Sequence, residues 1–205
     1  KLGDLKKLQP PKGGMVTHVE STMTERPAPQ LYDLSSLQIE AGQMLHLTPD
    51  EVLEIVQSLY EKHKVISYPR TQCRYVSSEK AKEFPAMLSK MAVFPELAGF
   101  EVDGNAIKKV MKNKRIVNDA EVEKEAHDAL LPTDKTPDLS KMTDREVAVC
   151  RLIYTRLLAQ FMPTLKEEKT KLIIHYGDIP FMAFGKRIQD LGWRQLYGPL
   201  RESVL

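Results

Sequence analysis

The chain has 205 residues, of which 42% are hydrophobic and 28% are charged. This composition is typical of a globular protein with one or two domains and a hydrophobic core, and it argues against intrinsic disorder. The net charge of +2 is too small to give the whole molecule a strong electrostatic field, so contacts with a nucleic acid have to come from local basic clusters.

Apolar runs and cysteine spacing exclude further classes. No apolar run approaches the ~20 residues that span a bilayer, and no signal-peptide core follows the first residues, so we expect no membrane partner. Cys73 and Cys150 have no cysteine or histidine at metal-ligand spacing, which excludes a zinc finger and favours a reducing, cytoplasmic location. Because the first residue is Lys1 rather than Met, we expect the chain to be excised from a longer protein.

The first half of the chain predicts an irregular start followed by two capped helices. Residues 1–14 are basic and punctuated by Pro and Gly, and residues 15–20 favour a short β-strand. Asp33 is expected to cap a helix that runs to about residue 45. Thr48-Pro49-Asp50-Glu51 is a capping box with proline at the first helical position, and the apolar stripe after it predicts a helix that ends near residue 63.

The second half changes from short helices to β-structure. Ser77 or Ser78 is expected to cap a helix that Pro85 interrupts, and residues 92–142 predict short helical pieces. A second capping box, Thr143-Asp144-Arg145-Glu146, opens a long helix that Pro163 ends. The alternating residues on either side of Gly177-Asp178 predict a β-hairpin over 171–184, followed by a turn and a further strand before residue 197.

The run Ile66-Ser67-Tyr68-Pro69-Arg70-Thr71 has the residue types needed to move a phosphodiester bond onto a phenol. Pro69 keeps Tyr68 out of the α region, so the tyrosine lies on an extended segment. Side chains at i and i+2 of an extended segment share a face, which would let Tyr68 and Arg70 approach the same phosphate. A phenol with an ordinary pKa of about 10 needs help to attack at neutral pH, and a guanidinium is a natural partner for the phosphate oxygens.

A histidine in the run from Glu125 to Thr133 completes the set. His127 could hydrogen-bond the same phosphate or transfer protons. By spacing alone, however, Tyr-x-Arg is a common tripeptide. The more frequent explanation of such residues is a half-buried strand tyrosine, a solvated arginine and a structural histidine at a helix edge.

Five segments in the same order resemble type IA DNA topoisomerases, most closely the topoisomerase III branch. The run from Leu31 to Ala41 is similar to the family's LYDLTSLQREA, and the run from Ile66 is similar to ITYPRTDSRYL. The other three segments resemble the family's HHAIIPT element, its LIxRRFLAQFxP helix and its strand pair ending in GxxxxxxGW; they are residues 125–133, 154–163 and 170–193. Together the five cover most of residues 15–197.

The resemblance implies both a fold and an activity. It implies an α+β fold, in which a mainly helical tyrosine-bearing domain (33–165) is inserted into a small antiparallel β bridging domain, formed by a lead-in at 1–32 and a return at 166–205. Tyr68 would be the nucleophile that joins a DNA 5′-phosphate, Arg70 would position that phosphate and His127 would contact it. The intact enzyme would cleave one strand of DNA, pass another strand and reseal the break, thereby relaxing or decatenating DNA without a nucleotide cofactor.

Departures and absences limit what the chain is expected to do alone. Gln72-Cys73 replaces the family's usual Asp-Ser, whereas Asp128, which follows the histidine, is expected to matter little. The family binds Mg²⁺ through an Asp-x-Asp cluster on a Toprim domain, and this sequence contains no Asp-x-Asp. We therefore expect no cofactor in this segment, Mg²⁺ in the full-length enzyme, the missing Toprim and remaining domains as partners, and no relaxation or decatenation by the isolated segment.

Charged clusters offer further candidates. The densest basic cluster contains Lys108, Lys109 and Lys112, and Arg74 lies near the tyrosine; each is either a solvated surface residue or a contact to the backbone of single-stranded DNA. Four alternating acidic residues could suggest a hard-cation site, but no turn brings their carboxylates together, so a solvated edge is the preferred interpretation; they are Asp119, Glu121, Glu123 and Glu125.

Other functions remain as alternatives. A tyrosine recombinase would need His-x-x-Arg, and a conjugative relaxase would need a closely spaced histidine pair; neither is present around His127. A catalytically decayed DNA-binding or interaction module of the same fold is the remaining alternative, because Gln72 stands where the family usually has a carboxylate.

Overall fold

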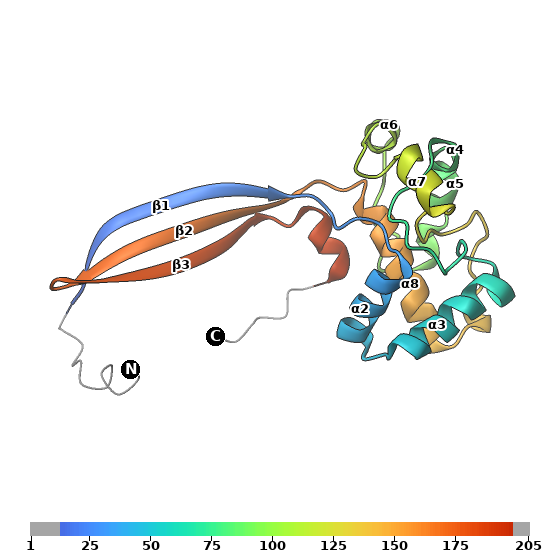
Figure 1. The fold of residues 1–205 in the computed structure, drawn as a ribbon, viewed down its shortest axis with the longest axis horizontal. Coiled ribbons are helices and arrows are strands. Elements are labelled where there is room, and N and C mark those ends of the chain that lie inside the picture. The colour runs from blue at the N-terminus through green and yellow to red at the C-terminus, as the bar shows by residue number, and fades with distance from the viewer. Residues whose placement is uncertain (1–12, 199–205) are drawn as a thin grey trace. The chain divides into compact units, whose positions relative to one another are not determined.

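A computed structural model describes residues 13–198 of the chain (Figure 1). The contacts divide it into two compact units. One contains the N-terminal strand and residues 164–192, and the other contains residues 27–163 and the segment from Trp193 onward. The expected domain boundaries were 33 and 165, whereas the chain passes between units at 27, 164 and 193. The irregular start predicted for residues 1–14 lies almost entirely outside the described residues.

The first unit is a three-stranded antiparallel sheet in the order β1-β2-β3, formed by β1 (Met15–Arg26), β2 (Leu165–Tyr176) and β3 (Ile179–Asp190) (Figure 1). The hairpin between β2 and β3 turns at Gly177, whose φ of 62° suits the first central position of a type II′ turn. Together with the helices of the second unit, the sheet confirms the predicted α+β class.

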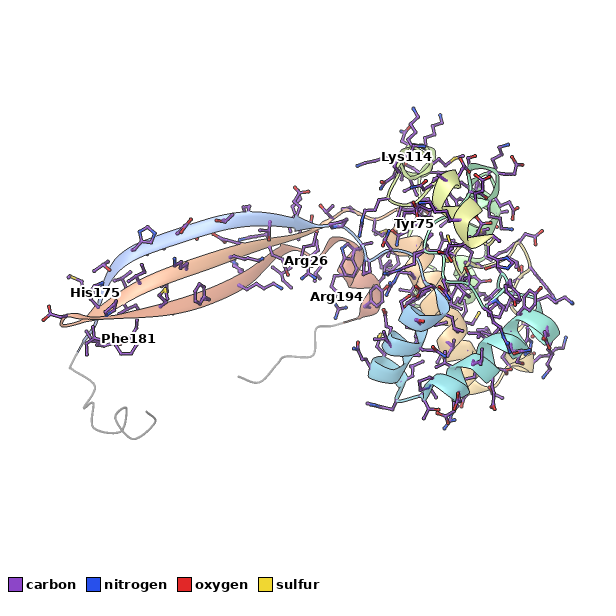
Figure 2. All side chains as sticks on the ribbon, in the orientation of Figure 1. Arg26, Tyr75, Lys114, His175, Phe181 and Arg194 are labelled. Atoms are coloured by element: carbon purple, nitrogen blue, oxygen red, sulfur yellow. The ribbon has the colours of Figure 1, made fainter. Side chains whose placement is uncertain are left out.

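The strands are about twice as long as the sequence predicts. Residues 165–170 and 185–190 are rich in charged and polar side chains, so no apolar alternation marks them as strands. The sheet extends through them because residues 166–170 of β2 pair with β1 on one side and with β3 on the other, so the pairing with neighbouring strands replaces an apolar pattern. Near the hairpin, Tyr176 and Phe181 make an edge-to-face contact with 5.4 Å between ring centroids; Figure 2 labels the phenylalanine.

The second unit is built around α8 (Asp144–Ala159), which packs against α2 (Leu34–Leu45) and α3 (Pro49–Ser58) (Figure 1). All three begin with the predicted caps: Asp33 forms a capping box with Ser36, Thr48 with Glu51, and Thr143 with Glu146. Most residues of α8 are buried, so this helix forms the centre of the core.

Short elements surround these three helices. Ser77 caps α4 as predicted, and Pro85 lies in the first turn of a separate helix, where its missing N–H costs no hydrogen bond. The further strand expected between Gly185 and Tyr197 does not form, because β3 continues to Asp190 and the chain then forms a 3₁₀ helix. The Trp193 N–H of this helix donates to the carbonyl of Pro163 (2.9 Å). The short elements are α4 (Ser78–Ala81), α5 (Phe84–Leu88), η2 (Met91–Val93), α6 (Gly104–Met111), α7 (Asp119–Glu125), η3 (Leu139–Lys141) and η4 (Gly192–Tyr197).

A buried arginine on α8 joins several of these segments. Arg156 donates to the hydroxyl of Tyr197 (2.9 Å), to the carbonyl of Gln30 (2.9 Å) and to the hydroxyl of Tyr32 (3.1 Å), and it forms an ion pair with Glu40. Burial by itself disfavours the charge of Arg156, but its partners Tyr32, Tyr197 and Glu40 raise its pKa. A buried charge with this many partners fixes residues 30–32, α2 and η4 against α8.

A second buried cluster lies where α3 ends. Helix α3 continues into a π-helical turn, η1 (Leu59–His63). His63 Nε2 at the end of this turn lies 3.4 Å from Glu146 Oε1, and the same oxygen accepts a hydrogen bond from the hydroxyl of Ser58 (2.5 Å). Burial alone would raise the pKa of Glu146, but the hydrogen bonds from Ser58 and Thr143 and the nearby His63 lower it to about 2. The carboxylate therefore ties the first turn of α8 to the end of α3.

We expect Glu146→Gln to lower the free energy of unfolding at pH 7 by about 1–3 kcal/mol, because charge-assisted hydrogen bonds are lost at a buried site. The folded pKa of Glu146, about 2, lies below its ordinary value of 4.5, so the stabilisation is present above 4.5 and is lost as the pH falls through 2. Urea denaturation of the unchanged protein and of the Glu146→Gln variant, from pH 7 down to pH 3, measures the difference in their free energies of unfolding.

The matched control is Glu51→Gln, which changes the same position of the capping box on α3, where no buried histidine is present. Its effect on the free energy of unfolding should be the smaller of the two. Glu51→Gln also removes an exposed ion pair with Arg145, which contributes little to stability. A loss for Glu146→Gln no larger than that for Glu51→Gln, or one that does not become smaller as the pH falls, would show that the buried cluster adds no stability beyond the cap.

Candidate active site

Tyr68 lies on an extended segment directly after the π-turn. Lys64, with a φ of 59°, ends the turn, and Ile66 pairs with Pro132 in an isolated antiparallel bridge. Tyr68, two residues after Ile66, is 39% exposed, whereas Pro69 is buried. The predicted extended conformation thus places the phenol at the surface while the proline anchors the backbone below it.

His127 lies on a second segment that runs beside the first. Helix α7 ends at Ala126, whose φ of 60° turns the chain, and His127 follows as an exposed residue. Beyond it, the Ala129 N–H donates to the carbonyl of Tyr75 (2.8 Å), and the Leu130 N–H donates to the carbonyl of Tyr32 (2.8 Å). The backbone that directly follows the histidine is therefore hydrogen-bonded to two other segments of the chain.

Ser67 joins the two segments. Its N–H donates to the carbonyl of Leu131 (2.8 Å), and its hydroxyl accepts from the Leu131 N–H (2.9 Å) and donates to the carbonyl of Ala129 (3.2 Å). One residue thus makes three hydrogen bonds to the histidine-bearing segment. Tyr68 directly follows Ser67, and His127 precedes Ala129 by two residues, so this pairing holds the two side chains near each other.

The side chains form a row of rings. The centroids of Tyr68 and His127 are 4.7 Å apart with an interplanar angle of 41°, and those of Tyr60 and Tyr68 are 5.7 Å apart at 80°. The structure therefore brings together two of the three predicted catalytic residues, Tyr68 and His127, although they are 59 positions apart in the sequence.

Arg70 is exposed on the same extended segment, and its Nη2 donates to Oε1 of Gln57 on α3 (3.3 Å). Gln57 in turn donates to Glu61 Oε1 (2.8 Å). The next residue, Thr71, accepts through its carbonyl from the Leu34 N–H at the start of α2 (3.1 Å). The guanidinium is thus directed toward α3 by a surface hydrogen bond, on backbone that is attached to the core.

Comparison with known proteins identifies the family of the chain. The family model for DNA topoisomerases matches residues 4–204. The chain belongs to the DNA topoisomerase family. DNA topoisomerase 3 of Bacillus subtilis (strain 168) is 36% identical over 201 residues, which is 97% of this chain and 27% of that protein. DNA topoisomerase 3 of Vibrio cholerae is 33% identical over 188 residues, 92% of this chain and 28% of that protein.

These matches confirm the resemblance to the type IA family and its topoisomerase III branch. The chain spans about a quarter of the length of the curated relatives it matches. The fold is similar to that of full-length topoisomerase I from Thermotoga maritima, with a TM-score of 0.68 and 21% identity, covering 98% of this chain and 32% of that structure.

The structure shows how the chain's departures from the family pattern are accommodated. Gln72 is exposed, whereas Cys73 is buried and burial raises the pKa of its thiol. Asp128 has a structural role that the sequence did not indicate, because its Oδ1 accepts from the Ser77 N–H (2.6 Å) at the start of α4. The carboxylate at position 128 thus joins the histidine-bearing segment to Ser77, the N-cap residue of α4.

The predicted DNA-binding residues differ in their surroundings. Arg74 is half-buried, and its Nε donates to the carbonyl of Leu31 (3.1 Å), so part of its guanidinium supports the fold. Lys108 and Lys109 on α6, and Lys112 just after it, are exposed. Figure 2 labels Lys114, which continues this basic stretch and is also exposed.

The structure offers no Mg²⁺ site among residues 13–198, where no three His, Cys, Asp or Glu side chains converge. The alternating acidic residues lie on α7, where side chains two apart face different sides of the helix. Asp119 is used otherwise: its Oδ1 accepts from the Ser78 N–H (2.6 Å), a hydrogen bond that lowers its pKa. None of the helices described here has the length and hydropathy that crossing a bilayer requires.

Sequence reasoning missed Ser67, Gln57 and Tyr60, which touch the predicted residues. Alternation along the extended segment offered a signal for Ser67, because a residue next to an outward-facing tyrosine points toward the protein body. No comparable signal existed for Gln57, which lies on α3, or for Tyr60, whose position depends on the π-turn that follows α3.

We expect Ser67→Ala to lower the free energy of unfolding by about 1–3 kcal/mol, since it leaves the N–H of the buried Leu131 without its acceptor. The same substitution should speed hydrogen exchange at the Leu131 amide, which chemical denaturation combined with exchange measured by NMR can test. The matched control, Ser89→Ala, removes an exposed hydroxyl that bonds only to its own helix and should change stability by less than about 0.5 kcal/mol. Equal effects of the two variants would contradict a joining role for Ser67.

Proposed function

We propose that Tyr68 is the nucleophile of a type IA topoisomerase reaction on single-stranded DNA. Its phenolic oxygen attacks a backbone phosphorus, a bond from tyrosine to the 5′-phosphate forms, and the bond to the 3′-oxygen breaks and leaves a 3′-hydroxyl. Attack by that hydroxyl reverses the step and reseals the strand, so no nucleotide cofactor is consumed. The contact of an exposed tyrosine ring with His127, on backbone paired through Ser67, is the observation that supports this proposal most strongly.

His127 and Arg70 act on the same phosphate in this proposal. The imidazole lies against the Tyr68 ring, so a phosphate at the phenolic oxygen is within its reach to accept a hydrogen bond. Arg70 follows Tyr68 by two residues and exchanges its surface hydrogen bond with Gln57 for the stronger charge-assisted bonds that a phosphate offers. Both groups then balance the negative charge that builds up during the attack.

The remaining expectations concern the full-length protein. Lys108, Lys109 and Lys112 bind the DNA backbone, with Arg74 contributing the N–H groups that its bond to Leu31 leaves free. The sheet of β1, β2 and β3 belongs to the bridging domain that carries the helical unit during strand passage. Mg²⁺ binds on a Toprim domain outside this segment, and the enzyme acts in the bacterial cytoplasm on relaxation or decatenation substrates.

Covalent trapping tests the proposal. The full-length protein that contains this chain is incubated with Mg²⁺ and a single-stranded oligonucleotide, then denatured and resolved by electrophoresis. We expect a 3′-end label to remain with the protein and a 5′-end label to be released, because the tyrosine keeps the 5′-phosphate. Tyr68→Phe should remove the adduct completely, since no other oxygen lies at that position.

Tyr176→Phe on β2 is the matched control and should leave the adduct unchanged, because this tyrosine belongs to the sheet unit. The isolated 205-residue chain should neither relax nor decatenate plasmid DNA. A full-length protein that binds the oligonucleotide but yields no adduct would instead be a catalytically decayed DNA-binding module, the alternative that Gln72 leaves open. An adduct that survives Tyr68→Phe would disprove the role of Tyr68.

A further inference from the structure

An open groove of about 320 Å³ lies beside the candidate nucleophile. It is lined by Tyr60 and Glu61 from the π-turn, by Lys64 and Ile66 on the way to Tyr68, and by Thr133 from the histidine-bearing segment. Its volume falls at the lower end of the roughly 300–1,000 Å³ typical of ligand pockets. The groove is therefore large enough for a small flat group.

The walls of this groove are held in place by the pairing of the two segments. The Thr133 hydroxyl donates to the carbonyl of Lys64 (2.9 Å), and the Thr133 N–H donates to the carbonyl of Val65 (3.0 Å). Ile66 is buried and contributes an apolar surface. These hydrogen bonds fix the groove without any ligand, so a ligand would bind with little loss of backbone freedom.

Tyr60 forms an aromatic wall of the groove, and its ring is more exposed than packing in a protein core would leave it. Its side chain is 38% exposed, although burial is the ordinary place for a large aromatic ring, and its ring meets Tyr68 edge to face. Because Tyr60 contacts the candidate nucleophile directly, a group bound against Tyr60 is next to the phosphate that Tyr68 would attack. Exposed aromatic rings in single-strand binding proteins act as stacking platforms for bases.

The charges of the groove distinguish a base from a phosphate. The lining contains one cation, Lys64, and one anion, Glu61, so a phosphate would be attracted by one and repelled by the other. A nucleobase has a flat face for Tyr60, and its edge carries both hydrogen-bond donors for Glu61 and acceptors for Lys64. The groove therefore matches the base better than the backbone of DNA.

We infer that this groove is a nucleotide subsite, in which a base adjacent to the scissile phosphate stacks on Tyr60 and meets Glu61 and Lys64 at its edge. The inference rests on the proposed function, and it adds a residue that positions the strand for attack. Stacking at this point would hold the phosphate over Tyr68 and His127 while Arg70 binds its oxygens.

Binding measurements separate this subsite from the chemistry. In the full-length protein carrying Tyr68→Phe, which prevents cleavage, we would measure the dissociation constant for a single-stranded oligonucleotide by fluorescence anisotropy. Tyr60→Leu should weaken binding by about fivefold or more, the lower end of what one stacked base contributes, whereas Tyr60→Phe should stay within about twofold. The matched control Phe184→Leu removes an exposed aromatic ring on β3 and should also stay within about twofold.

A scan with single abasic residues along the oligonucleotide identifies the stacked base. At one position of the oligonucleotide, the abasic residue should weaken binding to the parent protein, which keeps Tyr60. At the same position, the parent and the Tyr60→Leu variant should bind with equal affinity. The reason is that the ring then has no base to stack on. Two results would overturn the subsite. One is a dissociation constant of the Tyr60→Leu variant within about twofold of that of its parent. The other is a loss of affinity on Tyr60→Leu that is the same for every abasic oligonucleotide.

The two proposals fail in different ways. Normal adduct formation through Tyr68, combined with an unaltered affinity of the Tyr60→Leu variant, would reject the subsite and leave the proposed function intact. Loss of affinity in Tyr60→Leu that an abasic residue cancels, in a protein that forms no adduct, would support the subsite and reject the catalytic proposal.

Discussion

The three hydrogen bonds between Ser67 and the backbone of Ala129 and Leu131 are the constraint on which the candidate site depends. They join two segments that are far apart in the sequence, and each segment carries one of the rings in contact, Tyr68 and His127. The same two segments form the walls of the groove beside Tyr60. The positions of the candidate nucleophile, of the histidine and of the groove therefore all depend on a single backbone pairing.

This pairing is connected to the core of the helical unit. The histidine-bearing segment bonds to the backbone of Tyr32, whose hydroxyl accepts from the buried Arg156 on α8. The tyrosine-bearing segment leaves the π-turn, where His63 meets Glu146 on the same helix. Helix α8 thus supports both sides of the site through charged side chains, and charge at these positions is stabilised only because several partners surround it. Such a frame holds the exposed candidate catalytic side chains in place without burying them.

Local sequence signals predicted the local structure well and the tertiary structure poorly. The caps at Asp33, Thr48 and Thr143 and the turn at Gly177 were predictable, because each depends on residues within a few positions. The polar ends of the strands were not, since their pairing depends on neighbouring strands rather than on an apolar pattern. For the site, the resemblance to topoisomerases indicated Tyr68 and His127, but their contact arises from Ser67 and could not be read from spacing.

The most direct test of the account is a crystal structure of the full-length protein with Tyr68→Phe bound to a single-stranded oligonucleotide. The account predicts one phosphate beside the ring at position 68, with oxygens about 3 Å from a ring nitrogen of His127 and from the guanidinium of Arg70. An ordered strand whose phosphates all lie away from these two side chains would contradict the assignment of Tyr68 as the nucleophile.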